Sequence, residues 1–136
     1  MEFLKKLFAK KEQAGEKNFV AQGWPDRITL RRNDGAAPRE IEDPSEEELR
    51  LFLQSMYDDA DQFVVLTLPE ARDGIRYVQA CQVPEGIIVQ LGIEHKGGVS
   101  LHEKLCSREE TDAVFAKFLA EGTVEDRESF TEVVMG

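Results

Sequence analysis

Two histidines and three groups of carboxylates are the residues of this sequence whose types could do acid–base or metal chemistry. His95 stands in a predicted hairpin turn and His102 on a predicted strand, and neither has carboxylate partners at a spacing typical of a metal site. The acidic groups lie at residues 46–48, 58–61 and 125–126. The first belongs to a predicted helix start and the second to a helix exit, so both have structural explanations. We therefore expect surface histidines, no metal site and no catalytic carboxylate pair.

The other residues that commonly do chemistry form no stronger pattern. The sequence has no nucleophile elbow, no glycine-rich loop after a strand and no phosphate-binding GKS or GKT, and Gly97-Gly98 is typical of a turn. Cys81 and Cys106 lie in or beside apolar runs without a CxxC pair, which favours buried thiols over the alternative of a disulfide. We expect no cofactor and predict that the protein is not an enzyme.

A polar face on a central strand is the candidate binding site. Tyr77 and Gln79 alternate along the predicted strand 75–81, so both point to one side of the sheet. Gln90 lies on the next strand, and a glutamine within a sheet needs hydrogen-bond partners or solvent. We take Tyr77, Gln79, Gln90 and His102 as candidate residues for binding a partner or small ligand on an exposed sheet face. The alternative is an ordinary solvated face.

The first 12 residues have the pattern of a short, basic amphipathic helix. Its apolar side chains share one face and lysines surround them; the apolar residues are Phe3, Leu4, Leu7 and Phe8. A helix this short needs a surface to lie on. We interpret these four side chains as a contact for a membrane surface or a partner, with docking on the protein's own body or a frayed tail as alternatives. Residues 13–23 lack periodicity and indicate a linker.

The rest of the pattern predicts one α+β domain over residues 24–136. Strands are expected at 27–31, 63–68, 75–81, 87–93 and 99–105. The connections between the last four are too short for crossover helices, so these strands must run antiparallel. Residues 36–44 are expected to be irregular. The predicted fold is an antiparallel β-meander of about five strands packed with two amphipathic helices, plus the short N-terminal amphipathic helix.

Two capping boxes mark the predicted helices of the domain. Ser45 with Glu48 begins the first and Ser107 with Glu110 begins the second. Each box is followed by apolar residues at helical spacing, which predicts a face that packs on the sheet. Gly122 is suited to end the second helix, because glycine readily adopts the left-handed conformation of a helix cap.

The charge of the chain excludes one class of partner and favours another. The sequence has 27 acidic against 17 basic side chains, a formal net charge of −10. Residues 1–17 have five lysines and three glutamates, so their net charge is +2 and that of the remainder is −12. Such a field repels nucleic-acid phosphates and speeds encounter with basic partners. We expect a basic protein as the partner and no nucleic acid.

The sequence predicts a cytoplasmic protein. No apolar stretch reaches the roughly 18–20 residues that cross a membrane. The N-terminus lacks the apolar core and small-residue cleavage site of a secretory signal. Attachment to the inner face of the membrane through residues 1–12 is the alternative, and the protein would then be a membrane-peripheral accessory protein.

The order of motifs between residues 45 and 122 resembles a group of small bacterial proteins. A capped helix precedes Phe63-Val64-Val65-Leu66, then comes Tyr-Val-Gln-Ala at 77–80, and a Phe-x-x-Phe-Leu helix at 115–119 ends at Gly122. This pattern is similar to mostly uncharacterised α+β proteins that include immunity proteins of polymorphic toxin systems. The resemblance implies stoichiometric binding, not catalysis, with an acidic surface that complements a basic toxin, commonly a nuclease. It assigns no individual binding residue.

Overall fold

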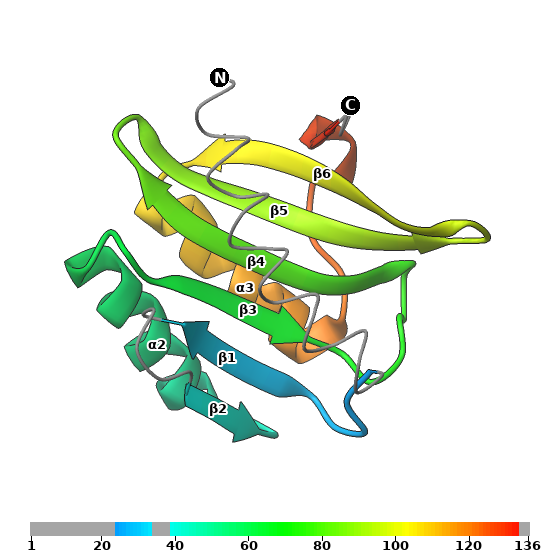
Figure 1. Ribbon diagram of the computed structural model, residues 1–136, viewed down its shortest axis with the longest axis horizontal. Coiled ribbons are helices and arrows are strands. Elements are labelled where there is room, and N and C mark those ends of the chain that lie inside the picture. Colours follow the sequence, from blue (N-terminus) through cyan, green and yellow to red (C-terminus); the bar gives the residue numbers. More distant parts are fainter. Residues whose placement is uncertain (1–23, 34–38, 134–136) are drawn as a thin grey trace.

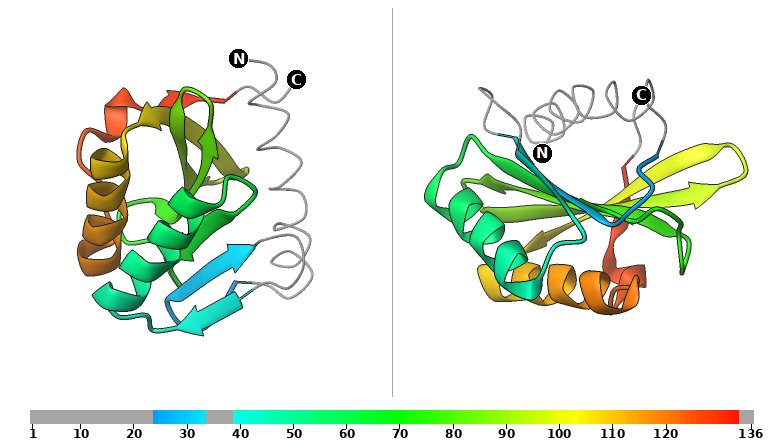
Figure 2. Two further views of the ribbon diagram at one scale, coloured as in Figure 1. Left: turned by 90° about the vertical axis from the view of Figure 1, so that its left-hand side faces the viewer. Right: turned by 90° about the horizontal axis from the view of Figure 1, so that it is seen from below.

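The computed structural model describes residues 24–33 and 39–133, and within them the chain has the predicted α+β architecture. One antiparallel sheet runs in the order β2-β1-β3-β4-β5-β6-β7, and two helices, α2 and α3, lie together on one of its faces (Figures 1 and 2). The strands are β1 Thr29–Asn33, β2 Arg39–Glu42, β3 Phe63–Thr67, β4 Ile75–Val83, β5 Gly86–His95, β6 Gly98–Cys106 and β7 Thr131–Glu132. The helices are α2 Glu46–Asp58, α3 Arg108–Glu121 and the short 3-10 turn η1 Arg127–Ser129.

The described sheet has seven strands where about five were expected. The additional strands are the two edges: β2, in a segment expected to be irregular, pairs with β1, and the two-residue β7 pairs with β6. From β3 to β7 the strands are sequential neighbours, as a meander requires. At the other edge, α2 connects β2 back to β3 across β1, so this part is not a simple meander.

Both helix starts confirm the predicted capping boxes. The Ser45 hydroxyl accepts from the Glu48 amide at 3.1 Å, and the Glu48 carboxylate accepts from the Ser45 amide at 2.9 Å. Ser107 and Glu110 make the same exchange at 3.1 and 3.0 Å. Gly122 caps the end of α3 at φ +74°, the left-handed conformation that glycine adopts without a steric cost.

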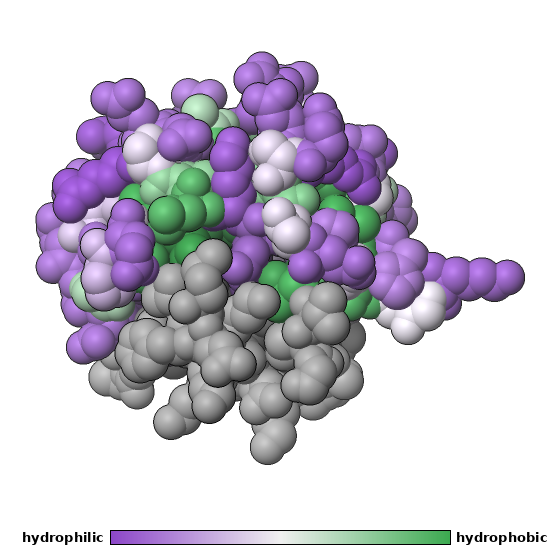
Figure 3. All heavy atoms as spheres, turned by 90° about the horizontal axis from the view of Figure 1, so that it is seen from above, coloured by the Kyte–Doolittle hydropathy of each residue, from purple (hydrophilic) through white to green (hydrophobic). Residues whose placement is uncertain are grey.

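Polar side chains dominate the described part of one face of the molecule. Seen from above in Figure 3, hydrophilic side chains surround smaller apolar areas. Among the described residues no helix is long and apolar enough to cross a membrane. The predicted helix at 1–12, with Phe3, Leu4, Leu7 and Phe8, lies outside the described residues, and the division at residue 23 stays a prediction.

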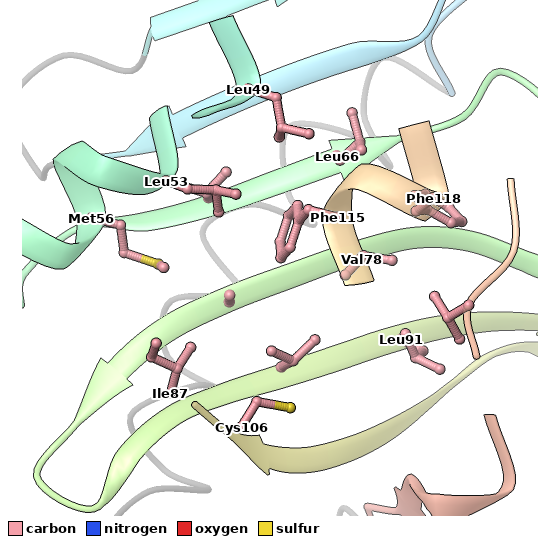
Figure 4. Close-up of a cluster of buried hydrophobic side chains, with 14 of the residues drawn as sticks. Leu49, Leu53, Met56, Leu66, Val78, Ile87, Leu91, Cys106, Phe115 and Phe118 are labelled. Atoms are coloured by element: carbon pink, nitrogen blue, oxygen red, sulfur yellow. The ribbon is translucent and has the colours of Figure 1, made fainter. Parts of the chain in front are cut away.

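The central strands bury apolar side chains on both faces of the sheet. On the face toward the helices, side chains of α2 and α3 meet those of β3, β4, β5 and β6 in the first cluster (Figure 4). On the opposite face, a second cluster contains Phe63, Val65, Tyr77, Cys81, Val83, Ile88, Leu101 and Val133. The unbroken apolar run from Phe63 is buried throughout β3, as its composition predicted.

Candidate functional site

Three polar side chains form a row across the face of the sheet that bears the second cluster. Gln79 of β4 pairs in register with Gln90 of β5, which pairs with Glu103 of β6. The Gln79 side-chain amide donates to the Gln90 carbonyl oxygen at 2.8 Å. The Gln90 amide donates in turn to the Glu103 carboxylate at 3.2 Å. The structure therefore joins the two predicted glutamines directly and adds Glu103, which the sequence did not single out.

The polar row is not the exposed patch that the sequence suggested. Gln79 is 4% exposed, Gln90 is 2% exposed and Tyr77 is 6% exposed. The solvent-open polar face proposed for these residues is therefore wrong: all three side chains are buried, and the two amides hydrogen-bond to one another. Only Glu103, at the end of the row, is partly open to solvent.

His102 lies apart from the other three predicted residues. It follows Leu101, a member of the second cluster, so it points to the other side of β6. There its Nε2 lies 3.2 Å from the Ser100 hydroxyl. His95 is exposed at the β5–β6 turn, where its Nδ1 accepts from the Gly97 amide at 3.2 Å. Within residues 24–33 and 39–133, no group of three histidine, cysteine, aspartate or glutamate side chains is arranged to hold a metal ion.

Exposed carboxylates gather at one end of the described part of the molecule. The exit of α2, the β4–β5 turn and the entry of α3 meet at one end of the sheet's strands. Gln82 donates to the carbonyls of Met56 and Tyr57 at 2.7 and 2.8 Å, and the Tyr57 hydroxyl donates to Asp112 at 2.6 Å. We define the acidic end as Asp58, Asp59, Asp61, Glu85, Glu109 and Asp112, all exposed. Of these six, only the group at 58–61 stands out in the sequence, because the others are distant along the chain.

Few cations balance this end. Arg108 is the one basic residue in the three segments that form it, and its guanidinium carbon lies 5.0 Å from the centre of the Tyr57 ring. None of the six carboxylates forms an ion pair with a described residue. Away from this end some charges are paired: Arg76 with Glu94 at 2.7 Å, Arg127 with Asp73 at 3.4 Å and Lys117 with Glu125 at 3.5 Å. Glu70, Glu121 and Glu128, which also lie away from it, form no ion pair with a described residue. Six exposed carboxylates without an ion pair to a described residue therefore lie together where α2 ends and α3 begins.

Tyr57 fixes the geometry of the acidic end. Burial raises the pKa of its phenol well above the usual value, and the hydrogen bond to the Asp112 carboxylate raises it further. The neutral hydroxyl therefore stays a donor and ties α2 to the first turn of α3. Neither group is arranged as a nucleophile with a base, so the contact is structural.

A shallow hollow of about 540 Å³ lies at the other end of the strands, beside the loop between β3 and β4. Its lining residues are Trp24, Pro25, Asp26, Pro69, Glu70, Ala71, Arg72 and Arg76. The guanidinium carbon of Arg76 stands 4.4 Å from the centre of the Trp24 ring, and its charge is balanced by Glu94. The lining offers two acidic and two basic side chains but no histidine, cysteine or serine.

These features define the class of the molecule as a small antiparallel α+β protein with a buried polar row and one acidic end. Comparison of the chain with protein-family models, with curated proteins and with solved structures gave no match.

Proposed function

We propose that this protein is a non-catalytic binding module that takes a basic protein partner on its acidic end. The observation that supports the proposal is the meeting of six exposed carboxylates, none of which forms an ion pair with a described residue, at one end of the sheet's strands. Unpaired surface charges of one sign attract an oppositely charged partner over distances of about 8–10 Å in physiological salt. They speed association and penalise partners of the same sign.

The acidic end is also well ordered for binding. The two hydrogen bonds from Gln82 hold the last turn of α2 on β4, and the Tyr57–Asp112 contact holds α2 on α3. Carboxylates on elements fixed in this way lose little conformational freedom when a partner binds, so more of the interaction free energy appears as affinity. An immunity-type role is the specific form of this proposal: one copy of the protein would bind and block one copy of a basic toxin, commonly a nuclease.

The test compares two variants with the same change in net charge. Asp58→Asn, Asp61→Asn and Glu109→Gln together neutralise half of the acidic end. The matched control is Glu70→Gln, Glu121→Gln and Glu128→Gln, three exposed carboxylates without ion pairs that lie away from it. Tagged full-length protein is used to capture partners from a lysate of the cells that make it, at low and at high salt, with mass-spectrometric identification and titration of the purified partner.

The proposal expects one basic protein bound in equimolar amount and released by high salt. The control variant should retain this protein, and the acidic-end variant should bind it with an affinity at least about tenfold lower. Equal weakening by both variants would show that only net charge matters and would remove the acidic end as the site. If no basic protein binds at low salt, the proposed function is wrong.

A further inference from the structure

The second cluster is an apolar face of the sheet that lies away from both described helices. Its members come from β3, β4, β5 and β6 and from Val133, and their exposed fractions range from 0 to 9%. The register places Cys81 opposite Phe63 on one side and Ile88 on the other, near the middle of the face. Side chains buried to this degree need a layer of protein over them, because an uncovered sheet face would leave them open to water.

The described residues supply only the margins of such a layer. Both α2 and α3 lie on the opposite side of the sheet (Figure 2). Trp24 stands at one margin, with its ring centre 6.3 Å from that of Tyr77. Val133 stands at another margin, where its backbone amide donates to the Leu101 carbonyl at 2.8 Å. Across the described part of the chain, no helix covers the centre around Val65, Cys81 and Ile88.

We infer that the chain's own N-terminal segment, residues 1–12, covers this face, with Phe3, Leu4, Leu7 and Phe8 packed on the second cluster. The described chain begins at Trp24, which already lies at the margin of the face. The 11 residues at 13–23 reach up to roughly 36 Å when extended, which is enough to return the segment to any part of the sheet. The amphipathic pattern of the segment supplies one apolar side, which is what a single covering layer requires.

The dimensions of the segment fit the dimensions of the face. A helix of 12 residues is about 18 Å long. The four strands that bear the second cluster span about 14–15 Å, since neighbouring strands lie about 4.8 Å apart. One short helix laid across β3 to β6 would therefore cover the cluster from edge to edge.

Charge favours this occupant over a lipid surface. Residues 1–17 have a net charge of +2 and the remainder of the chain has −12. The segment is therefore attracted to the rest of the protein, whereas anionic lipid repels the rest of the protein. Tethering adds a further advantage, because a linked segment meets its site at an effective concentration in the millimolar range.

The two cysteines provide the test, since one lies on each face of the sheet. Cys81 belongs to the second cluster, whereas Cys106 is buried under the helices in the first. The full-length protein is treated with a small maleimide, and the labelling rate of each cysteine is followed by peptide mass spectrometry. Leu4→Ser with Leu7→Ser removes apolar contacts from the segment; Lys5→Ser with Lys6→Ser is the matched control on its opposite side.

The inference expects labelling of Cys81 to rise roughly tenfold or more in the leucine variant, with no change at Cys106 and none in the lysine control. Equal protection of Cys81 in both variants would overturn it. So would protection that depends on protein concentration, which indicates a second copy, or protection that appears only with anionic vesicles, which indicates a membrane contact.

A disulfide trap decides the question even if the leucine variant unfolds. In the Cys106→Ala background, Leu4→Cys and Leu7→Cys are each oxidised with diamide, and Lys5→Cys serves as the control. At least one of the leucine positions is expected to form a disulfide with Cys81 within the same molecule, and the lysine position is not. Failure of both leucine positions to form it would overturn the inference.

Discussion

The ring of Tyr77 lies over Gly92, its register partner across β4 and β5, and fills the space that a side chain at position 92 would need. A Cβ atom added to Gly92 would fall well inside contact distance of three ring carbons. The absence of a side chain at position 92 therefore allows the Tyr77 ring to lie close to the sheet, where the Trp24 ring also lies near it. This contact joins the start of the described chain to the second cluster.

Gly92→Ala is expected to lower the free energy of unfolding by about 1–3 kcal/mol, since the added methyl group must displace the ring. At a position without such a neighbour, glycine to alanine is neutral or stabilising by about 0.4–1 kcal/mol when the backbone conformation is compatible. Gly97→Ala is the control, because its nearest neighbour is the exposed His95 ring at 3.6 Å. Urea denaturation measures both. Equal stability of the two variants would contradict the contact.

The helices and the central strands could be predicted because their signals are local. Each capping box needs only residues three positions apart, and the apolar runs of β3 and β4 indicate strands by themselves. The edge strand β2 gives no such signal: Arg-Glu-Ile-Glu has one apolar residue, and it becomes a strand because β1 lies beside it. The same holds for β7, whose two residues pair with β6.

The candidate site was predictable only in part, for a related reason. Alternation placed Tyr77 and Gln79 on one face, but it contains no information on what covers that face, so burial of the glutamines was missed. Alternation places His102 on the side of its strand opposite Leu101, yet its position relative to Gln90 depends on the register of β5 and β6. The acidic end depends on the contact between Tyr57 of α2 and Asp112 of α3, which are 55 positions apart in the sequence. Local sequence patterns do not contain such a contact.

Tyr57→Phe is expected to lower the free energy of unfolding by about 1–2 kcal/mol. A hydrogen bond to a charged group contributes about 1.5–3 kcal/mol, and the partly exposed setting reduces this because water can hydrate Asp112 after the change. Asp112→Asn keeps an acceptor and should cost less. A double-mutant cycle with Asp112→Ala measures the coupling. If the two changes add without coupling, the tyrosine does not hold α2 on α3.

Stability at alkaline pH should depend on Cys106. Burial and, to a smaller extent, the nearby Glu110 carboxylate together raise the pKa of its thiol from 9.0 to about 11. Above pH 9 the unfolded chain loses this proton while the folded chain keeps it. The contribution is therefore complete below about pH 9 and is lost as the pH rises through 11. The difference in unfolding free energy between the wild type and Cys106→Ala should shrink by about 1.4 kcal/mol per pH unit in this window. A difference independent of pH would contradict the assignment.

The Gln79–Gln90 pair provides the sharpest test of whether the polar row is structural. Gln79→Leu leaves the buried Gln90 carbonyl oxygen without the donor at 2.8 Å, which is expected to cost about 1–3 kcal/mol. In Gln79→Leu with Gln90→Leu, two apolar side chains face each other in an apolar cluster, and Glu103 can turn to water. The double variant should therefore be more stable than the sum of the single changes predicts, by about 1 kcal/mol or more in urea denaturation.

Gln54→Leu is the control for the substitution itself, since Gln54 is exposed on α2 and donates only to Asp58 at 3.1 Å; its cost should stay within about 0.5 kcal/mol. Additive single changes would mean that the two amides do not act as a pair.

The folded double variant also separates the two roles considered for this face, binding and stability. If it still binds the basic partner with wild-type affinity, the row serves the fold and the binding surface lies elsewhere. Loss of binding from a variant that is still folded would instead return Gln79 and Gln90 to the binding site and weaken the case for the acidic end.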